Sequence, residues 1–370
     1  MKLCYIGRSY LPSGIRSIVE NDVDALRSLG CDVQVPKLSV YDEFEVRSVN
    51  SDVDAVICTD VYAAMKIRDV RSLRRKTLLF IRGRMDDNLD PDPTISYWRL
   101  RFASFLDHID LSKATLLENL GRVLEQRLLH IDSDRYENVH KSVYKVIASF
   151  SPVYVSSASW GDLLKKCFGV NYVKVALGLD KSYWKRDGPY QTRSDKVKVL
   201  IPTGLFKCKK LDYGLAKINN AVYRLKNLID TCDFLWYNND YRSLKDDLHE
   251  RYPNINFVTD ATADPKALFQ QYDLVIHPSL GESFSKIVLE CLSIGLPCLV
   301  SSVSEDILGD HVLCVDPRSQ LYDSALDKLI TRPNLRMDLS RKASEFARKW
   351  ISWQDRARMI IDEVKRKGLA

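Results

Sequence analysis

Short apolar segments with strand character alternate with amphipathic helical segments along this chain, and this alternation restricts it to the α/β class. The first strand is followed by apolar residues at helical spacing, which stop at Gly30, a residue suited to a helix C-terminus. The strand-like segments of the first half are residues 2–6, 31–35, 54–58, 77–81, 153–155 and 173–175. Residues 95–149 have helical character. Strands joined by helices predict a mostly parallel sheet.

The same pattern starts again after a polar, aperiodic segment at residues 187–194. The second set of strand-like segments is residues 197–201, 234–237, 255–258, 274–277 and 298–300, with a helix expected from about Asp212. At 370 residues the chain is also too long for one hydrophobic core. We therefore predict two Rossmann-like, doubly wound domains that face a cleft.

Composition and charge exclude several classes of protein. A hydrophobic fraction of 45% is ordinary for a soluble globular protein, and no apolar run approaches the roughly 20 residues of a membrane-spanning helix. The nine cysteines form no C-x-x-C pair, so we expect no disulfide framework or zinc ribbon, and a reducing, cytoplasmic location. A net charge of +6 suits an anionic small molecule or membrane surface and is too diffuse to predict nucleic-acid binding.

The most informative segment runs from Asp273 to Pro297. A predicted strand ends at Pro278 and Ser279, a tight loop follows, and a helix is expected from about Phe284 to Gly295. The start of such a helix presents unpaired backbone amides and a partial positive charge, which suit a phosphate group. The residues that would carry these amides are Ser283, Phe284, Ser285 and Lys286.

Two carboxylates in this segment are candidates for binding a sugar. Glu282 precedes the helix at the carboxyl end of a strand, where open α/β sheets bind their ligands. Glu290 interrupts an apolar helix face and needs partners, which the two hydroxyls of a ribose would supply. For two isolated glutamates, a helix cap and a solvated helix position are the simpler interpretation. The residues around Glu282 and Glu290 favour the sugar-binding interpretation instead.

The segment resembles the signature of the retaining glycosyltransferases of family 4, the "glycosyl transferases group 1" set with the GT-B fold. The family pattern is a strand, Pro-Ser, Glu-x7-Glu with Ser-Phe after the first Glu, and then Gly-x-Pro. The residues in register are Pro278, Ser279, Glu282, Ser283, Phe284, Glu290, Gly295 and Pro297. The resemblance implies that Glu282 lies beside the transferred sugar as a catalytic residue. It also implies that Glu290 binds the ribose and the helix amides bind the diphosphate.

Weaker matches follow in the family's order along nearly the whole chain. Residues 10–15 resemble a Pro-x-x-Gly-Gly turn that approaches the donor phosphates, with Gly14 kept and Ile15 in place of the second glycine. Arg82 opens an Arg-Gly turn on the acceptor side, where the histidine of many family members is absent. Residues 178–180 resemble the end of the first domain.

Residues 350–353 resemble the start of a C-terminal helix that crosses back to the first domain. The resemblance therefore implies three units: an acceptor-side domain at residues 1–186, a nucleotide-sugar domain at 187–350, and a helix at 351–370 that packs on the first domain.

A basic loop at residues 203–210 corresponds to the family's Gly-Arg-x4-Lys loop, whose two cations neutralise the departing diphosphate. Lys210 aligns with the family lysine and is the second expected catalytic residue, whereas Leu205 stands where arginine is expected. A missing cation at a leaving group costs catalysis. Lys207, Lys209 or Lys286 could replace it, and a solvated basic loop is the alternative for the first two.

Several other residue patterns have simpler structural explanations. Four dispersed Asp-x-Asp pairs, among them Asp22 with Asp24, fit a solvated surface better than a metal site. The histidines lack H-x-x-x-H spacing, so we expect no zinc, and His277 either packs or faces the cleft. An aromatic stripe at residues 98–109 is either a packed helix face or a peripheral contact with the cytoplasmic membrane surface.

The sequence thus predicts a retaining glycosyltransferase that uses a nucleotide-diphosphate sugar and a glycan or lipid-linked hydroxyl acceptor, without a metal or cofactor. A catalytically impaired GT-B scaffold that binds a glycan or a partner is the alternative, because Leu205 and Ile15 depart from the family pattern. A dinucleotide-dependent oxidoreductase is disfavoured, since the first strand and helix are not joined by G-x-G-x-x-G.

Overall fold

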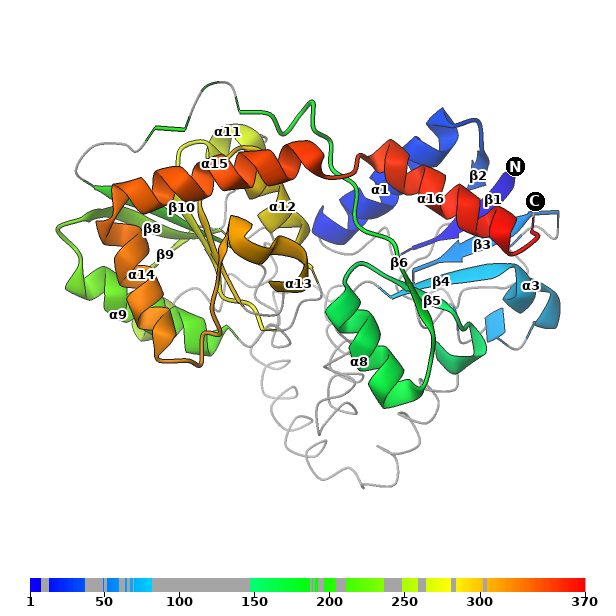
Figure 1. Cartoon of the computed structure of the whole chain (residues 1–370), viewed down its shortest axis with the longest axis horizontal. Coiled ribbons are helices and arrows are strands. Elements are labelled where there is room, and N and C mark those ends of the chain that lie inside the picture. The colour runs from blue at the N-terminus through cyan, green and yellow to red at the C-terminus, as the bar shows by residue number, and fades with distance from the viewer. Residues whose placement is uncertain are drawn as a thin grey trace, which may run out of the picture.

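The structure is a computed structural model of the 370-residue chain. It describes residues 1–7, 13–36, 49, 52–59, 64, 67–68, 70–81, 147–186, 188, 190–191, 196–203, 211–235, 248–258, 264–280, 284–301 and 305–369. Within these ranges the chain forms two parallel six-stranded sheets flanked by helices, which stand side by side in Figure 1. The prediction of two Rossmann-like α/β domains is confirmed.

The first sheet has the strand order β2-β1-β3-β4-β5-β6. Its strands are β1 (Lys2–Ile6), β2 (Asp32–Gln34), β3 (Ala55–Cys58), β4 (Thr77–Ile81), β5 (Val153–Val155) and β6 (Tyr172–Lys174). The helices of this half are α1 (Ser13–Ser28), α3 (Arg71–Lys76) and α8 (Ala158–Phe168). All residues of β3, β4 and β5 are buried, as expected for parallel strands that are covered on both faces.

The second sheet has the order β12-β11-β10-β7-β8-β9, so the winding direction reverses between β7 and β10. Its strands are β7 (Val197–Pro202), β8 (Ile229–Leu235), β9 (Asn256–Val258), β10 (Leu274–His277), β11 (Cys298–Val300) and β12 (Leu313–Cys314). Its helices are α9 (Asp212–Arg224), α11 (Pro265–Phe269), α12 (Lys286–Ser293), α13 (Glu305–Leu308), α14 (Leu321–Thr331) and α15 (Pro333–Lys349). Open sheets bind their ligands beside such a reversal, at the carboxyl ends of the strands.

The structure corrects three details of the predicted elements. Strand β8 begins at Ile229, five residues before its predicted start, because Asp233 is accommodated inside it by hydrogen bonds from Thr231 and Tyr272. Strand β12 has only two residues and was not predicted. Helix α12 begins at Lys286, two residues later than expected.

Three further expectations are tested only in part or not at all. Of the helical segment expected at residues 95–149, only 147–149 are described, and they are helical. The aromatic stripe at residues 98–109 lies outside the described residues, and the domain boundaries at 186/187 and 350/351 stay predictions.

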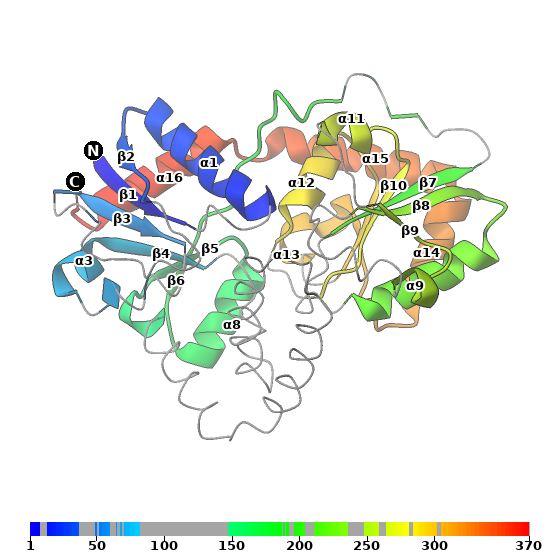
Figure 2. The same cartoon turned by 180° about the vertical axis from the view of Figure 1, so that it is seen from behind.

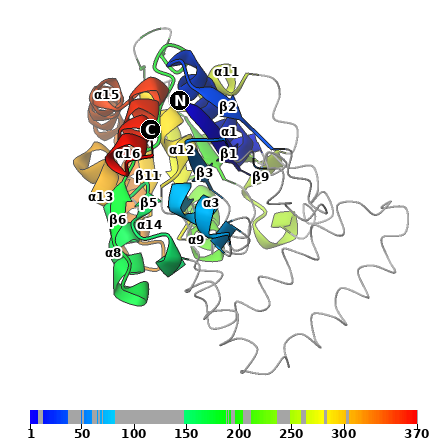
Figure 3. The same ribbon diagram turned by 90° about the vertical axis from the view of Figure 1, so that its right-hand side faces the viewer.

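The chain crosses from the second domain back to the first through its last two helices. Figure 1 shows α15 followed by α16 (Trp353–Arg366) along one side of the molecule, and Figure 2 shows α16 beside α1 from behind. Ser352 caps α16 in a reciprocal pair with Asp355, which fixes where the second helix begins. The crossing helix implied by the family resemblance is therefore present. Figure 3 shows that the two chain termini lie close together on the first domain.

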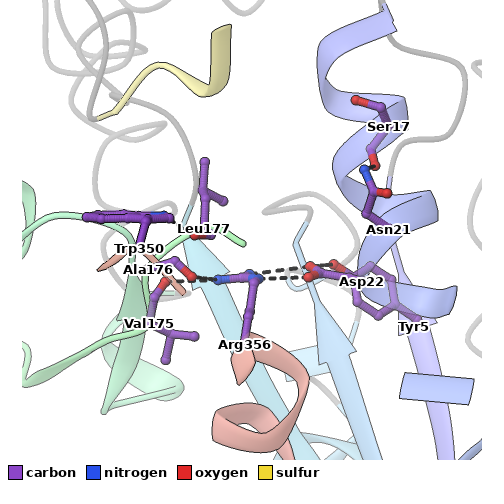
Figure 4. Close-up of polar contacts among 9 residues, drawn as sticks. All are labelled: Tyr5, Ser17, Asn21, Asp22, Val175, Ala176, Leu177, Trp350 and Arg356. Atoms are coloured by element: carbon purple, nitrogen blue, oxygen red, sulfur yellow. Dashed lines mark hydrogen bonds and ion pairs between the residues drawn. The ribbon is translucent and has the colours of Figure 1, made fainter. Parts of the chain in front are cut away.

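A buried ion pair fastens α16 to the first domain. The Arg356 Nε donates to Asp22 Oδ1 at 2.7 Å, and both side chains are at most 2% exposed. Tyr5 donates its hydroxyl to the same carboxylate at 2.6 Å. The Arg356 Nη1 donates to the carbonyls of Val175 and Ala176, so one guanidinium joins three segments of the chain (Figure 4). The assignment of Asp22 to a solvated surface is wrong, because α16 covers it.

Two chain crossings between the domains run directly beside each other. Residues Leu179 and Ser352 form a parallel bridge, and the Trp350 indole donates to the Leu177 carbonyl at 2.8 Å. A Cβ on Gly178 would lie 2.6 Å from the Trp353 Cα, a distance that real Cβ atoms do not adopt. Only glycine permits this approach, so Gly178 serves packing between the two crossings.

Replacement of Arg356 by Met tests the importance of the ion pair for folding. We expect the free energy of unfolding to fall by about 3–5 kcal/mol, because the substitution leaves the Asp22 carboxylate buried without its cation. The double variant Asp22→Leu/Arg356→Met should be more stable than Arg356→Met alone. Chemical denaturation followed by circular dichroism gives both values.

Arg358→Met is the matched control, since Arg358 lies on the same helix, is 59% exposed and pairs with Asp355. Its effect should stay within about 0.5 kcal/mol. A loss below about 1 kcal/mol for Arg356→Met would contradict a central role for the buried pair.

Candidate functional site

The candidate site is organised around the end of β10 and the start of α12. Strand β10 is buried along its whole length, and α12 follows it at the reversal of the second sheet. Ser285 is the N-cap residue of α12 but makes no side-chain capping bond. Its hydroxyl lies 3.3 Å from the His277 Nε2, and both side chains are buried. His277 is therefore a packed residue that ties the helix start to the end of the strand.

The other end of α12 is fixed by a glycine. Gly295 has a φ of +71°, and a Cβ there would lie 2.7 Å from the Ser344 hydroxyl of α15. The positive φ favours glycine, and any larger residue would also have to displace the Ser344 hydroxyl. Gly295, a position of the family pattern, thus ends α12 where the chain passes close to α15.

Glu290 has an internal partner that the sequence analysis did not identify. The Lys286 ammonium lies 2.5 Å from the Glu290 Oε1, one helical turn away. The two side chains are 19% and 9% exposed. Burial raises the pKa of the Glu290 carboxyl, and the neighbouring ammonium of Lys286 opposes this rise. The i,i+4 spacing of the two residues was the signal that could have revealed the pair.

This ion pair faces a cavity of about 200 Å³ where the two domains meet. Besides Lys286 and Glu290, the lining residues are Asn21 on α1, Gly178, Leu179, Asp180, Tyr183 and Trp184 of the connecting segment, and Trp353 on α16. The family motif in the second domain is therefore in contact with a space that the first domain and α16 help to enclose. The cavity can hold a small polar group next to a carboxylate and an ammonium.

Tyr183 adds an oriented aromatic ring to this cavity. The phenol donates to the Asp264 Oδ1 at 2.7 Å, and its ring meets the buried Trp184 edge to face. Partial burial and the hydrogen bond to Asp264 raise the pKa of Tyr183 to about 12, so its hydroxyl remains a donor at neutral pH. The resemblance at residues 178–180 did not extend to Tyr183, because nothing in the local sequence pattern places this position beside Glu290.

The structure brings some of the predicted site residues together and does not describe others. Glu290, Lys286, Ser285 and Phe284 lie on or next to α12. The Phe284 side chain is buried with its ring against Trp350, so any contact with a donor would fall to its backbone. Gly14 lies in the first turn of α1. The predicted residues that lie outside the described ranges are Arg82, Lys207, Lys210, Glu282 and Ser283. Their roles stay predictions.

A second contact between the domains lies between α8 and α13. Ser159, near the start of α8, donates its backbone amide to the Asp306 Oδ2 at 3.0 Å and its hydroxyl to the Oδ1 at 3.2 Å. Asp306 belongs to the second domain and Ser159 to the first. This contact and the crossing at residues 350–353 hold the two domains together at separate places.

Within the described part of the chain, His, Cys, Asp and Glu residues form no group of three that could hold a metal ion. None of the helices described has both the length and the hydropathy that crossing a bilayer requires.

Comparisons with known proteins concern the sequence family of the second domain and the fold of the whole chain. Residues 198–332, which include β10, α12 and the Lys286–Glu290 pair, match the family model described as glycosyl transferases group 1. No curated protein sequence matches the chain.

Solved structures share the fold over nearly the whole chain. HepE from Anabaena in complex with UDP-glucose has a TM-score of 0.70 and 13% identity, over 99% of this chain and 100% of that chain. Sucrose-phosphate synthase from Thermosynechococcus elongatus has a TM-score of 0.67 and 12% identity, over 99% and 98%. A glycosyltransferase from Rickettsia africae has a TM-score of 0.63 and 11% identity, over 99% and 98%. The chain therefore has the two-domain GT-B fold, and its second domain carries the segment that matches the glycosyl transferases group 1 model.

Proposed function

We propose that this protein is a retaining glycosyltransferase that moves a sugar from a nucleotide-diphosphate sugar to a hydroxyl group of a glycan or lipid-linked acceptor. One observation carries the proposal. The segment that matches the glycosyl transferases group 1 model places a buried carboxylate, Glu290, in a cavity between two domains of GT-B fold. A carboxylate in such a position suits the vicinal hydroxyls of a ribose.

The proposed donor site extends from Glu290 toward the start of α12. The backbone amides at the start of α12 would bind the diphosphate. They would belong to Lys286, the first residue of the helix, and to Ser283, Phe284 and Ser285, which precede it. The inward turn of the Ser285 hydroxyl toward His277 supports this assignment, because it leaves the helix start without a side-chain cap. Gly14 and Lys207 would approach the phosphates from the neighbouring loops.

Catalysis would depend on charge stabilisation. Glu282 would lie beside the transferred sugar, and Lys210 would stabilise the negative charge that develops on the departing diphosphate. Backbone amides and lysine together can serve this purpose, so we propose a reaction that needs neither a metal ion nor a cofactor. Arg82 would act on the acceptor side, where the first domain could also make a peripheral membrane contact.

The choice of donor base is best guided by the solved structures of similar fold. HepE was solved with UDP, with UDP-glucose, and with UDP and glucose. We therefore propose a UDP-sugar as the first donor to test. GDP-sugars and ADP-sugars complete the panel.

Donor binding to the wild-type protein and to Glu290→Gln tests the proposal. One member of the panel should raise the melting temperature and bind in calorimetry, and the variant should bind it about tenfold to a hundredfold more weakly. The reason is the loss of charge-assisted hydrogen bonds, each worth about 1.5–3 kcal/mol.

Glu345→Gln is the matched control for this experiment, because Glu345 also pairs one turn away on a helix, with Arg341, but on an exposed surface. It should bind the donor as the wild-type protein does. If no nucleotide sugar binds the wild-type protein, the alternative of a GT-B scaffold without donor turnover gains support, with Leu205 as its explanation.

The stereochemistry and metal independence have their own test. With an α-linked donor we expect an α-linked product, seen in the anomeric proton coupling by NMR, and an unchanged rate after treatment with EDTA. A β-linked product would contradict retention, and loss of activity that Mg²⁺ or Mn²⁺ restores would contradict metal independence.

A further inference from the structure

The order of charges in the Lys286–Glu290 pair is opposite to the order that stabilises a helix. Lys286 is the first residue of α12, where the helix dipole repels a cation, and Glu290 follows it. Glu before Lys at i,i+4 is the better arrangement for an isolated helix. The first turn of α12 also contains no acidic residue. Helix stability therefore does not account for a lysine at this position.

Burial of the pair explains why the lysine is held on Glu290. Glu290 is buried, and a buried carboxylate without a partner is costly. The Lys286 ammonium supplies that partner. It can leave only when other donors replace it, and the two hydroxyls of a vicinal diol could donate to the two carboxylate oxygens.

The charges around the cavity indicate a second group that the Lys286 ammonium could bind, a phosphate. Among the described side chains that line the cavity, Lys286 is the one with a positive charge, whereas Asp180 and Glu290 are acidic. The loop that would supply an arginine has Leu205 instead. Beside the proposed Lys207 and Lys210, one cation of the family loop is therefore missing, and Lys286 begins at that helix start on a flexible side chain that could supply it.

We propose that Lys286 is a movable counter-ion, which pairs with Glu290 in the empty site and passes to the diphosphate when ribose hydroxyls take its place on the carboxylate. This inference rests on the proposed function and identifies how the site recognises both parts of a nucleoside diphosphate at once. The nucleoside releases the lysine, and the diphosphate binds it. If the Lys286–Glu290 ion pair stayed fixed, Lys286 would instead contribute equally to the binding of a nucleoside and of a nucleoside diphosphate.

Calorimetry of the full chain with uridine and with UDP distinguishes a Lys286 that changes partner from a Lys286 that stays on Glu290. In Lys286→Gln the affinity for UDP should fall about tenfold to a hundredfold, because a charge-assisted phosphate contact is lost. The affinity for uridine should stay the same or rise, since the ribose no longer has to displace an ammonium. The preference for UDP over uridine should therefore fall at least tenfold. Lys286→Arg, which keeps the charge, should retain most of that preference.

Lys342→Gln is the control for loss of one lysine charge and one i,i+4 ion pair, because Lys342 pairs with Asp338 on α15, where both side chains are partly exposed. It should change neither affinity. Melting temperatures show whether all variants are folded. If Lys286→Gln does not fold, Lys286→Arg provides the comparison. Loss of the UDP preference in Lys286→Arg would then overturn the inference.

The remaining outcomes are also decisive. Equal weakening of uridine and UDP in Lys286→Gln, or an unchanged preference, would overturn the movable counter-ion and leave the proposed function intact. If the wild-type protein binds neither ligand and no other nucleoside diphosphate of the donor panel, the proposed function and the counter-ion fail together.

Discussion

The buried Asp22–Arg356 ion pair is the interaction on which the arrangement of this molecule most depends. It joins residues 334 positions apart, and its guanidinium also binds the carbonyls of Val175 and Ala176. Those carbonyls immediately precede the segment that lines the cavity. A single side chain from the C-terminal helix therefore positions both that helix and the connection between the domains. Buried ions of this kind require nearly complete hydrogen bonding, and Tyr5 supplies a further donor to Asp22.

The candidate site depends on this fastening because neither domain forms the cavity alone. Glu290 and Lys286 come from the second domain, whereas Asn21 comes from α1 and Trp353 from α16. The tight contact of Gly178 with Trp353 sets the position of the connecting segment relative to α16. A shift of the first domain would therefore change the shape of the space in front of the Glu290 carboxylate. The surroundings of Glu290 in the second domain therefore depend on the Asp22–Arg356 ion pair in the first.

The sequence was sufficient to predict the elements that local pattern controls, and insufficient where distant segments meet. Apolar runs identified most of the strands, and Gly295 and Gly30 were correctly assigned to helix ends, where both have positive φ. Asp22 was misassigned because its partner lies on the last helix and no local signal connects the two. The start of β8 was missed because Asp233 interrupts the apolar pattern and gains its hydrogen bonds only in the folded sheet. The partner of Glu290 was within reach of sequence reasoning, but its burial and the cavity in front of it were not.

A crystal structure of the protein with UDP-glucose tests the central claim most directly, because it locates both ends of the nucleotide relative to α12. We expect the ribose hydroxyls on the Glu290 carboxylate, the diphosphate at the first amides of α12, and the Lys286 ammonium on a phosphate oxygen. A nucleotide bound away from α12 would contradict the proposed donor site. A nucleotide bound there with the Lys286–Glu290 pair intact would contradict the exchange of partners by the lysine.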